Sequence, residues 1–408
     1  MKKISLLLLL FFLVQSFCLF AKDDKKKSSL TADRTLEIGL LNFNINFANS
    51  FITITDILQD VIVIDLDKLA EGFKLNLGVN MTPLFFNFNS KQGWGFGFST
   101  NVEAVGIINL SGNMLNLSEA VKDNSDISGA IFSSFTVKTY FDARKYKIKI
   151  NPSLFCALAY ITPPSNMPSS VVYTLDYTDG TVVSVDYAVR IYTAYSFEDK
   201  SITPNVMPGF DFSFGFEYPV AKEIGLTDII PLLDFDLGFD LINIPFFPST
   251  MMEYKQIKGQ IGKDTPIKLI NKDDDDGESL FSPDEKDSGR KQVKIYRPFK
   301  IFVHADWRPF GGTKFLTITP QIGYCYNTLY YQPYSFEGGL NACLSFGGLF
   351  KIKAGFNYID RMYINSYGIV INVKACEIDV GADLRSQNLI QVWSGSGFGI
   401  SFGLKFGW

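Results

Sequence analysis

The sequence predicts an all-β chain, a transmembrane antiparallel up-and-down β-barrel of 14 to 16 strands with short helices in its loops. Three observations lead to this fold class: an export signal at the N-terminus, strand-like alternation along most of the chain, and a final strand with one apolar face. In that final strand the residues of one parity are apolar or aromatic, and the residues between them are glycine, serine or lysine. The apolar positions are Phe398, Ile400, Phe402, Leu404, Phe406 and Trp408. Successive side chains of a strand point to opposite faces, so this strand suits lipid on one side and a lumen on the other.

The first 21 residues have the form of a secretory signal peptide. Lys2 and Lys3 precede the apolar run 4–20, and Ala21 is a small residue suited to cleavage. An uncleaved anchor and a lipoprotein are the alternatives, and the bulky Phe17 before Cys18 argues against the second. We therefore divide the chain into a signal peptide at 1–21, a charged N-terminal segment at 22–34 and an outer-membrane barrel at 35–408.

The composition is compatible with a barrel and excludes other classes. Aromatic residues make up 15% of the chain, with 38 Phe and 19 Tyr, and the formal net charge is -4. A lipid-facing surface uses many aromatic residues, whereas a lumen and loops restore polarity. No second apolar run is long enough for a membrane-spanning helix, because acidic residues such as Asp234 interrupt the nearest one at 224–247. Nothing in the charge pattern indicates a nucleic-acid partner.

Strand-period segments follow one another along the chain. We expect strands at 41–47, 73–81, 94–98, 131–141, 146–160, on both sides of Asp179-Gly180, and at 210–218, 233–241, 299–307, 316–326, 336–344, 350–358, 369–373, 376–384 and 397–408. The Asp-Gly pair is typical of a two-residue hairpin turn. The number of strands stays open between 14 and 16, because residues 369–384 form either two strands or one strand with a bulge near Lys374.

Short and long connections alternate between these segments. Short links are expected at 89–93, 142–145, 178–181, 308–314 and 347–348, and long ones at 48–72, 111–128, 196–206 and 247–293. If both termini are periplasmic, the long loops lie on the outer side. Residues 57–71 and 114–121 break the strand period and predict short helices. The longest connection carries an acidic, flexible loop at about 253–292, and it lacks calcium-loop spacing because Lys272 and Pro283 take two ligand positions.

Residues capable of catalysis are few. The single histidine, His304, lies two residues before Asp306 on the polar face of its strand, which leaves a membrane lipid hydrolase as a hypothesis. We prefer a polar lumen wall without chemistry and predict no enzyme activity. No metal, phosphate or cofactor motif is present, so we expect no cofactor. The mature chain keeps Cys156, Cys325, Cys343 and Cys376, which we interpret as unpaired thiols, with disulfides as the alternative.

The polar parity of the strands supplies candidates for the lumen wall. These residues are mostly acidic: Asp211, Glu217, Asp234, Asp236, Asp240, Lys300, His304, Asp306, Glu377, Asp379, Asp383 and Arg385. An open acidic lumen would favour cations or neutral solutes over anions. The same acids could instead pair with Lys351, Lys353 and Lys374 and fill a closed barrel.

Several short runs resemble a known group of barrels. The run Asp240-Leu241-Ile242-Asn243-Ile244-Pro245, the pair Arg297-Pro298-Phe299 and Arg308-Pro309-Phe310, and Leu384-Arg385-Ser386 occur together with the aromatic terminal strand. In this the chain resembles large outer-membrane barrels of spirochaetes, which are similar in size and layout to the long-chain fatty-acid transporters. That transporter family has an Asn-Pro-Ala hatch motif, whereas this chain reads Phe47-Ala48-Asn49-Ser50. We therefore transfer no binding residues from it.

These observations predict an outer-membrane protein for passive uptake of small or hydrophobic solutes. A plugged barrel with a structural or surface-interaction role is the alternative, and a lipid hydrolase is a weaker one. The expected partners are outer-membrane lipid, the solute, and the barrel-assembly machinery, which would read the terminal strand as its assembly signal.

Overall fold

The computed structural model describes residues 34–50, 72–111, 122–142, 146–164, 171–176, 182–198, 201–261, 285–310, 314–330, 332–373, 375–393 and 395–407. Four predictions lie outside these residues: the signal peptide, the helices expected at 57–71 and 114–121, the acid-rich centre of the long loop, and Trp408 of the terminal strand. They stay predictions.

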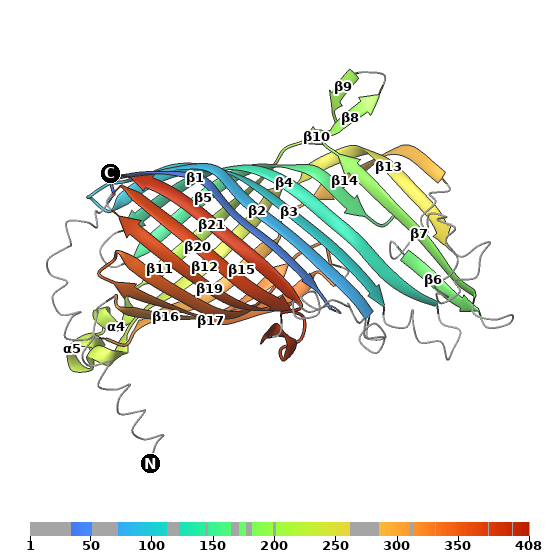
Figure 1. Ribbon diagram of the computed structural model, residues 1–408. Coiled ribbons are helices and arrows are strands. Elements are labelled where there is room, and N and C mark those ends of the chain that lie inside the picture. Colours follow the sequence, from blue (N-terminus) through green and yellow to red (C-terminus); the bar gives the residue numbers. More distant parts are fainter. Residues whose placement is uncertain are drawn as a thin grey trace, which may run out of the picture.

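The core of the fold is a closed barrel of 14 antiparallel strands (Figure 1). In order around the ring these are β1 (Leu36–Asn49), β2 (Gly72–Asn89), β3 (Trp94–Ser111), β4 (Lys122–Asp142), β5 (Lys147–Thr162), β11 (Gly209–Tyr218), β12 (Asp234–Phe247), β15 (Phe299–Arg308), β16 (Leu316–Tyr326), β17 (Tyr334–Phe346), β18 (Phe350–Ile359), β19 (Met362–Val373), β20 (Cys376–Ser386) and β21 (Gly397–Gly407). Pairing of β1 with β21 closes the ring, so no edge strand remains. The predicted fold class is confirmed.

The strand number is decided between β19 and β20. Val373 pairs with Cys376, so residues 369–384 form two strands joined by a tight turn rather than one strand with a bulge. The ring therefore holds 14 strands and not 16.

A second group of strands extends the wall beyond one rim, and we name it the annex sheet. It contains β6 (Val171–Asp176), β7 (Val182–Thr193), β13 (Ser249–Ile261) and β14 (Glu285–Ile295), and it joins the ring through β4 and β5. The short β10 (Val206–Met207) pairs with β13, and β8 (Tyr195–Glu198) and β9 (Ser201–Pro204) form a separate hairpin that projects from the rim (Figure 1).

The annex sheet corrects two sequence predictions. The long connection at 247–293, with its flexible loop at 253–292, begins and ends in strands. The reason is that the backbone of β13 pairs with β7 and β14, which the local sequence pattern does not predict. The hairpin predicted on both sides of Asp179-Gly180 is present, since β6 and β7 pair antiparallel, but its strands belong to the annex sheet and not to the ring.

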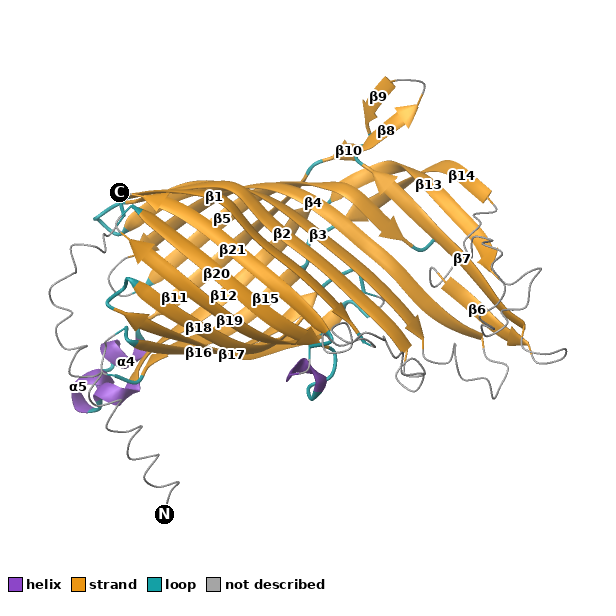
Figure 2. Cartoon of the chain, viewed as in Figure 1, coloured by secondary structure: helices purple, strands orange, loops and turns teal. Residues whose placement is uncertain are grey.

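The two rims of the ring differ as expected. The start of β1 and the end of β21 lie at the same rim of the ring (Figure 2). Most connections between strands at this rim are short. The exception is 219–233, which forms α4 (Val220–Glu223), α5 (Leu226–Ile229) and η2 (Pro231–Leu233). Strand alternation therefore begins at Asp234, and Asp228 lies in α5. At the other rim η3 (Gln391–Trp393) precedes β21. Among the described residues no helix has the length and apolar character to span a membrane.

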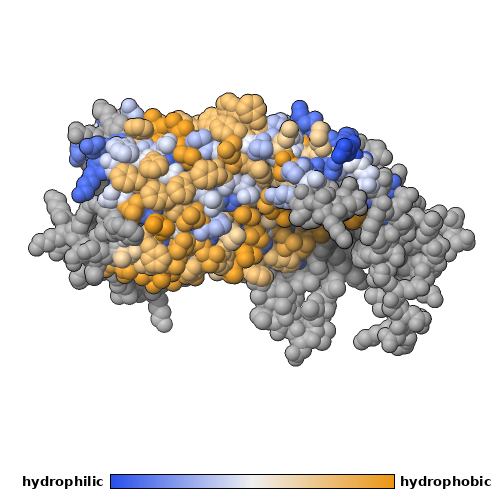
Figure 3. Space-filling model, turned by 90° about the horizontal axis from the view of Figure 1, so that it is seen from above, coloured by the Kyte–Doolittle hydropathy of each residue, from blue (hydrophilic) through white to orange (hydrophobic). Residues whose placement is uncertain are grey.

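The outer surface of the ring is apolar. Exposed aliphatic and aromatic side chains gather over its middle, with hydrophilic residues toward both ends (Figure 3). The terminal strand follows the predicted alternation, since Phe398 and Ile400 are exposed and Phe402 packs against Phe43 with ring centroids 5.9 Å apart. On the opposite face, glycines such as Gly399 leave room for inward side chains, here Asp383. A band of this kind is expected where strands face lipid.

Candidate functional site in the lumen

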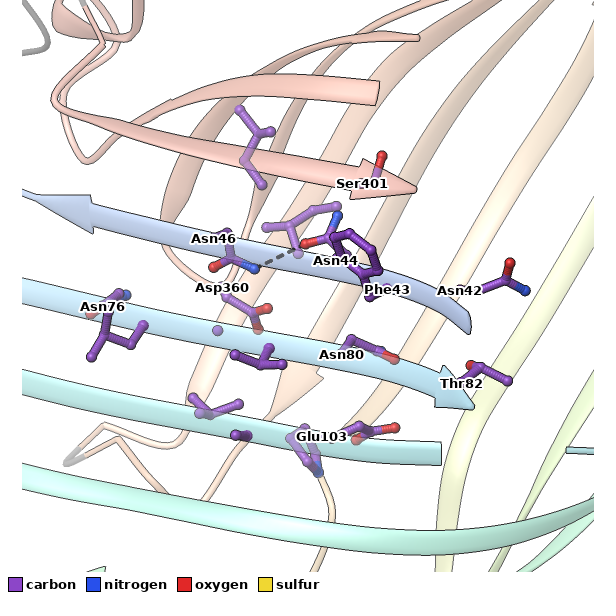
Figure 4. Close-up of a pocket in the computed structure, with 18 of the residues that line it drawn as sticks. Asn42, Phe43, Asn44, Asn46, Asn76, Asn80, Thr82, Glu103, Asp360 and Ser401 are labelled. Carbon is purple, nitrogen blue, oxygen red and sulfur yellow. Dashed lines mark hydrogen bonds between the residues drawn. The ribbon is translucent and has the colours of Figure 1, made fainter. Parts of the chain in front are cut away.

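The barrel encloses a cavity of about 800 Å³. Its wall is built mainly from β1, β2, β3, β20 and β21, and Figure 4 shows part of it. Polar side chains dominate the labelled part of the wall, and asparagine is the commonest residue type there.

Three of these asparagines come from β1. Asn42, Asn44 and Asn46 alternate with apolar residues, so strand geometry turns all three inward. A bulge at Leu41, where φ is 55°, adjusts the register, and the Asn42 Oδ1 accepts a hydrogen bond from the Leu404 amide at 2.9 Å. Asn46 donates to the Oδ1 of Asn44 at 3.2 Å.

The neighbouring strand β2 repeats the pattern with Asn76, Gly78 and Asn80. Gly78 lies against Asn46, and a Cβ atom at this glycine would approach the Asn46 Oδ1 to 2.5 Å, so only glycine leaves the amide in place. Among the described residues, the side-chain amides of Asn76 and Asn80 have no hydrogen-bond partner, and both line the cavity. They are available to a solute.

The charged residues around the cavity are compensated by partners of opposite charge. Lys405 lies 2.9 Å from Glu377, and Lys353 lies 2.5 Å from Asp379. Arg385 pairs with Asp383 through its Nε at 2.5 Å. Of the three lysines named for the alternative of a closed, paired network, Lys353 has an ion pair, Lys351 has none among the described residues, and Lys374 lies outside them.

The remaining sequence candidates form pairs along β11, β12 and β15. Arg308 binds Asp234 at 2.9 Å and Asp236 at 2.8 Å. Glu217 accepts hydrogen bonds from Lys147 and Lys149. Asp306 accepts one from the Thr319 hydroxyl at 2.6 Å. The candidates are thus spread around the wall, and only Lys300, Glu377, Asp379 and Arg385 line the cavity.

His304 is held against the wall. Its Nδ1 lies 3.4 Å from the Asp240 carboxylate, and the imidazole ring lies over Gly238, where a Cβ atom would meet its Nε2 at 2.1 Å. Asp306 has a different partner, so the two residues do not act as a pair. Among the described residues no hydroxyl or thiol group hydrogen-bonds to His304, and the triad arrangement needed for the hydrolase hypothesis is not assembled.

A short loop between β16 and β17, described at residues 327–330 and 332–333, reaches across the lumen. Ser128 of β4, almost on the opposite side of the ring, donates a hydrogen bond to the Leu329 carbonyl at 2.7 Å. Leu329 packs into a buried apolar cluster with side chains from β3, β4, β5, β7 and β13, among them Phe132 and Phe155. We name residues 327–333 the crossing loop. It narrows the lumen on the side of the annex sheet.

Tyr330 fixes the crossing loop to the turn between β18 and β19. Its hydroxyl donates to the Asp360 carbonyl at 3.2 Å, and the Arg361 guanidinium stacks on its ring at 4.6 Å. Burial, with the Asp360 carboxylate, raises the pKa of Tyr330, so the phenol stays a neutral donor. Asp360 and Arg361 both have positive φ, as a two-residue hairpin turn requires.

Lys300 closes a buried cluster beneath this turn. Its ammonium group donates to Glu337 at 3.0 Å and to Asp360 at 3.1 Å. The ligand atoms of Cys325, Glu337 and Asp360 lie within 4.8 Å of one another, a grouping that could hold a metal ion. The ammonium group already supplies the positive charge that the two carboxylates need, so we assign no metal site.

A second link across the lumen is made by Arg297, just before β15. It binds Asp211 of β11 with two nitrogens, at 2.8 and 2.6 Å, and Ser134 of β4 at 3.2 Å. Glu103 of β3 lies 3.7 Å away, and the Phe155 ring lies under the guanidinium at 5.3 Å. Arg297 therefore connects opposite parts of the wall.

Sequence reasoning missed the asparagines, Arg297 and the crossing loop. The asparagines could have been found from the sequence. Residues 41–47 were predicted as a strand with an apolar face, and Asn42, Asn44 and Asn46 occupy the opposite face of that strand. Arg297 lies outside a strand and the crossing loop is short, so neither carried a periodic signal. The four cysteines, Cys156, Cys325, Cys343 and Cys376, are free thiols, in agreement with the preferred interpretation.

Comparison with known proteins finds likeness in structure alone. No family model matches the sequence, and no curated protein matches it. The toluene transporter TodX of Pseudomonas putida has a TM-score of 0.49 at 9% identity, with 93% of this chain and 91% of that chain covered. The toluene transporter TbuX of Ralstonia pickettii has a TM-score of 0.46 at 9% identity, with 92% and 90% covered. A FadL homologue of Pseudomonas aeruginosa has a TM-score of 0.46 at 10% identity, with 92% and 90% covered. At these values we draw no functional argument from them.

Proposed function

We propose that this chain is an outer-membrane barrel that admits small solutes through its lumen. The observation that carries the proposal is a closed ring with an apolar outer surface that encloses a cavity of about 800 Å³, lined by both polar and apolar side chains. Lipid contact explains the outer surface, and a path for solutes explains a hydrated interior with unpartnered amides. Export by the signal peptide and assembly through the terminal strand belong to this proposal.

The crossing loop would control the path. It spans the lumen on a few contacts, which are the hydrogen bond between Ser128 and Leu329, the apolar packing of Leu329, and the contacts of Tyr330 with Asp360 and Arg361. One hydrogen bond contributes about 0.5–1.5 kcal/mol, so a loop held in this way can yield to a solute. Transport at a low basal rate, set by the loop, follows from this arrangement.

A plugged structural barrel is the second candidate, and the two links across the lumen favour it. Liposome swelling with the purified mature chain and glycerol as the solute separates the two functions. A Leu329→Gly/Tyr330→Gly variant removes the apolar packing of Leu329 and the contacts of Tyr330, but not the hydrogen bond from Ser128 to the main-chain carbonyl of residue 329. We expect liposomes with this variant to swell several times faster than liposomes with the wild type. Leu389→Gly/Ile390→Gly, at exposed positions of another loop on the same rim, is the matched control and should behave as the wild type. If both the wild type and the crossing-loop variant stay silent, the barrel is plugged and the uptake proposal is wrong.

A further inference from the structure

We propose that the solute taken into the lumen cavity is neutral and rich in hydroxyl groups, a small saccharide or polyol, rather than a hydrophobic compound or an ion. This inference rests on the proposed uptake function and names its substrate class.

The first argument is the chemistry of the wall. Asn42, Asn44 and Asn46 of β1 lie beside Asn76 and Asn80 of the neighbouring strand β2 on one side of the cavity, with Thr82 and Ser401 next to them (Figure 4). A side-chain amide offers two donor hydrogens and an oxygen acceptor without charge, and a hydroxyl group also both donates and accepts. Each amide in the cluster can therefore donate a hydrogen bond to a hydroxyl group of the solute or accept one from it.

The second argument is that some of these amides are open. Gln321, Asn341 and Asn357, elsewhere on the wall, bond to one another at 2.9 to 3.2 Å and use their polar atoms internally. Asn76 and Asn80, in contrast, have no partner among the described residues. A hydrophobic solute would displace water from these amides and leave them unbonded, at a cost of about 1–3 kcal/mol for each group.

The third argument is charge. The acids that line the cavity, Glu103, Asp360, Glu377 and Asp379, each lie within 4.0 Å of a basic group, which comes from Arg297, Lys300, Lys405 and Lys353 in turn. An ion entering the cavity would have to displace one of these partners. A neutral solute leaves every pair intact.

The size of the cavity is suitable for such a solute. Ligand-binding sites commonly enclose about 300–1,000 Å³, and the lumen cavity of about 800 Å³ lies within that range.

The experiment compares six-carbon carbohydrates of similar size that differ in charge. Swelling rates of liposomes that contain the full mature chain are measured with glucose, with cationic glucosamine and with anionic gluconate, and binding of toluene to the chain in detergent is measured in parallel. We expect glucose to enter several times faster than either ion, and toluene not to bind in competition with glucose. If the wild type is slow for all solutes, the crossing-loop variant serves as the test protein.

Variants test whether the open amides are responsible. Asn80→Asp should raise the ratio of glucosamine to gluconate entry severalfold, whereas Lys222→Gln, which changes the net charge equally on the exposed surface of α4, should not. Asn76→Leu/Asn80→Leu should slow glucose severalfold, whereas Ile45→Leu on the outer face of β1 should not.

The outcomes separate the two levels of the proposal. If no solute enters either test protein, the uptake function itself is wrong. If solutes enter according to size alone, or toluene competes, or the asparagine variants resemble their controls, uptake stands and the assignment of a hydroxyl-rich substrate is overturned.

Discussion

Arg297 and Asp211 form a bidentate ion pair inside the barrel, with nitrogen–oxygen distances of 2.8 and 2.6 Å. Asp211 is only 2% exposed, and the two residues come from segments 86 positions apart. The pair holds the start of β15 against β11, and Ser134 extends it to β4. The stability of the barrel and the width of the lumen therefore both depend on this ion pair.

Arg297→Ala should destabilise the barrel strongly. Removing one partner of a buried pair leaves the Asp211 charge uncompensated, at a cost of about 3–5 kcal/mol. Urea-induced unfolding in detergent micelles, followed by tryptophan fluorescence, measures the loss. Arg290→Ala breaks an exposed pair with Glu253 at 2.6 Å and should cost no more than about 1 kcal/mol. Equal losses in the two variants would contradict a central role for Arg297.

Gly78→Val should reduce the space for a solute. A Cβ atom at residue 78 would lie 2.5 Å from the Asn46 Oδ1, so the added side chain must push that amide aside and occupy part of the cavity. We expect slower liposome swelling, with the reduction greater for disaccharides than for glycerol. Gly106→Ala is the control, since its Cβ atom would meet the nearest atom at an ordinary 3.8 Å. Unchanged swelling in Gly78→Val would place the solute path elsewhere.

Ile322→Arg should weaken insertion into the bilayer. Ile322 is 54% exposed on the outer surface of β16, and an arginine near the bilayer midplane costs about 2–4 kcal/mol. Asn80→Arg introduces the same side chain on the hydrated inner face and should cost much less. Unfolding titrations in lipid vesicles compare the two variants. If the inner variant is the less stable one, the assignment of inner and outer faces is wrong.

Phe406→Ala should lower the amount of barrel that reaches the membrane in cells. Phe406 belongs to the apolar face of β21, the strand that closes the ring against β1 and that we propose as the assembly signal. The readout is the heat-modifiable fraction of the protein in outer-membrane preparations. Ser401→Ala, on the inner face of the same strand, should assemble normally. Normal assembly of both variants would show that the assembly machinery does not recognise the aromatic face of β21.

Much of the ring could be predicted from local pattern. Each ring strand overlaps a predicted segment, because the side-chain period of two is a property of the strand itself. However, β2, β3, β4 and β19 continue well beyond the predicted ends. The turn at Lys374 stayed ambiguous, since a bulge and a tight turn interrupt the period in the same way. The annex sheet was missed because β13 and β14 carry many charged residues and because β13 pairs with β7, far away in the chain.

The candidate site was predicted less well. Asp211, Asp234 and Glu377 were identified as inward acids, but their effect on a solute depends on the bases beside them. Arg297 and Lys405 come to these acids from distant positions, and only the closed ring shows that the lumen is compensated rather than acidic.

The sequence by itself determined that this chain forms strands with an apolar and a polar face, because the alternation along a strand depends only on the order of consecutive residues. Only the tertiary structure decided how many strands close the ring, which charges neutralise one another, and that the crossing loop and Arg297 span the lumen. Those features depend on contacts between residues that are distant in the chain, and a one-dimensional pattern contains no distances between them.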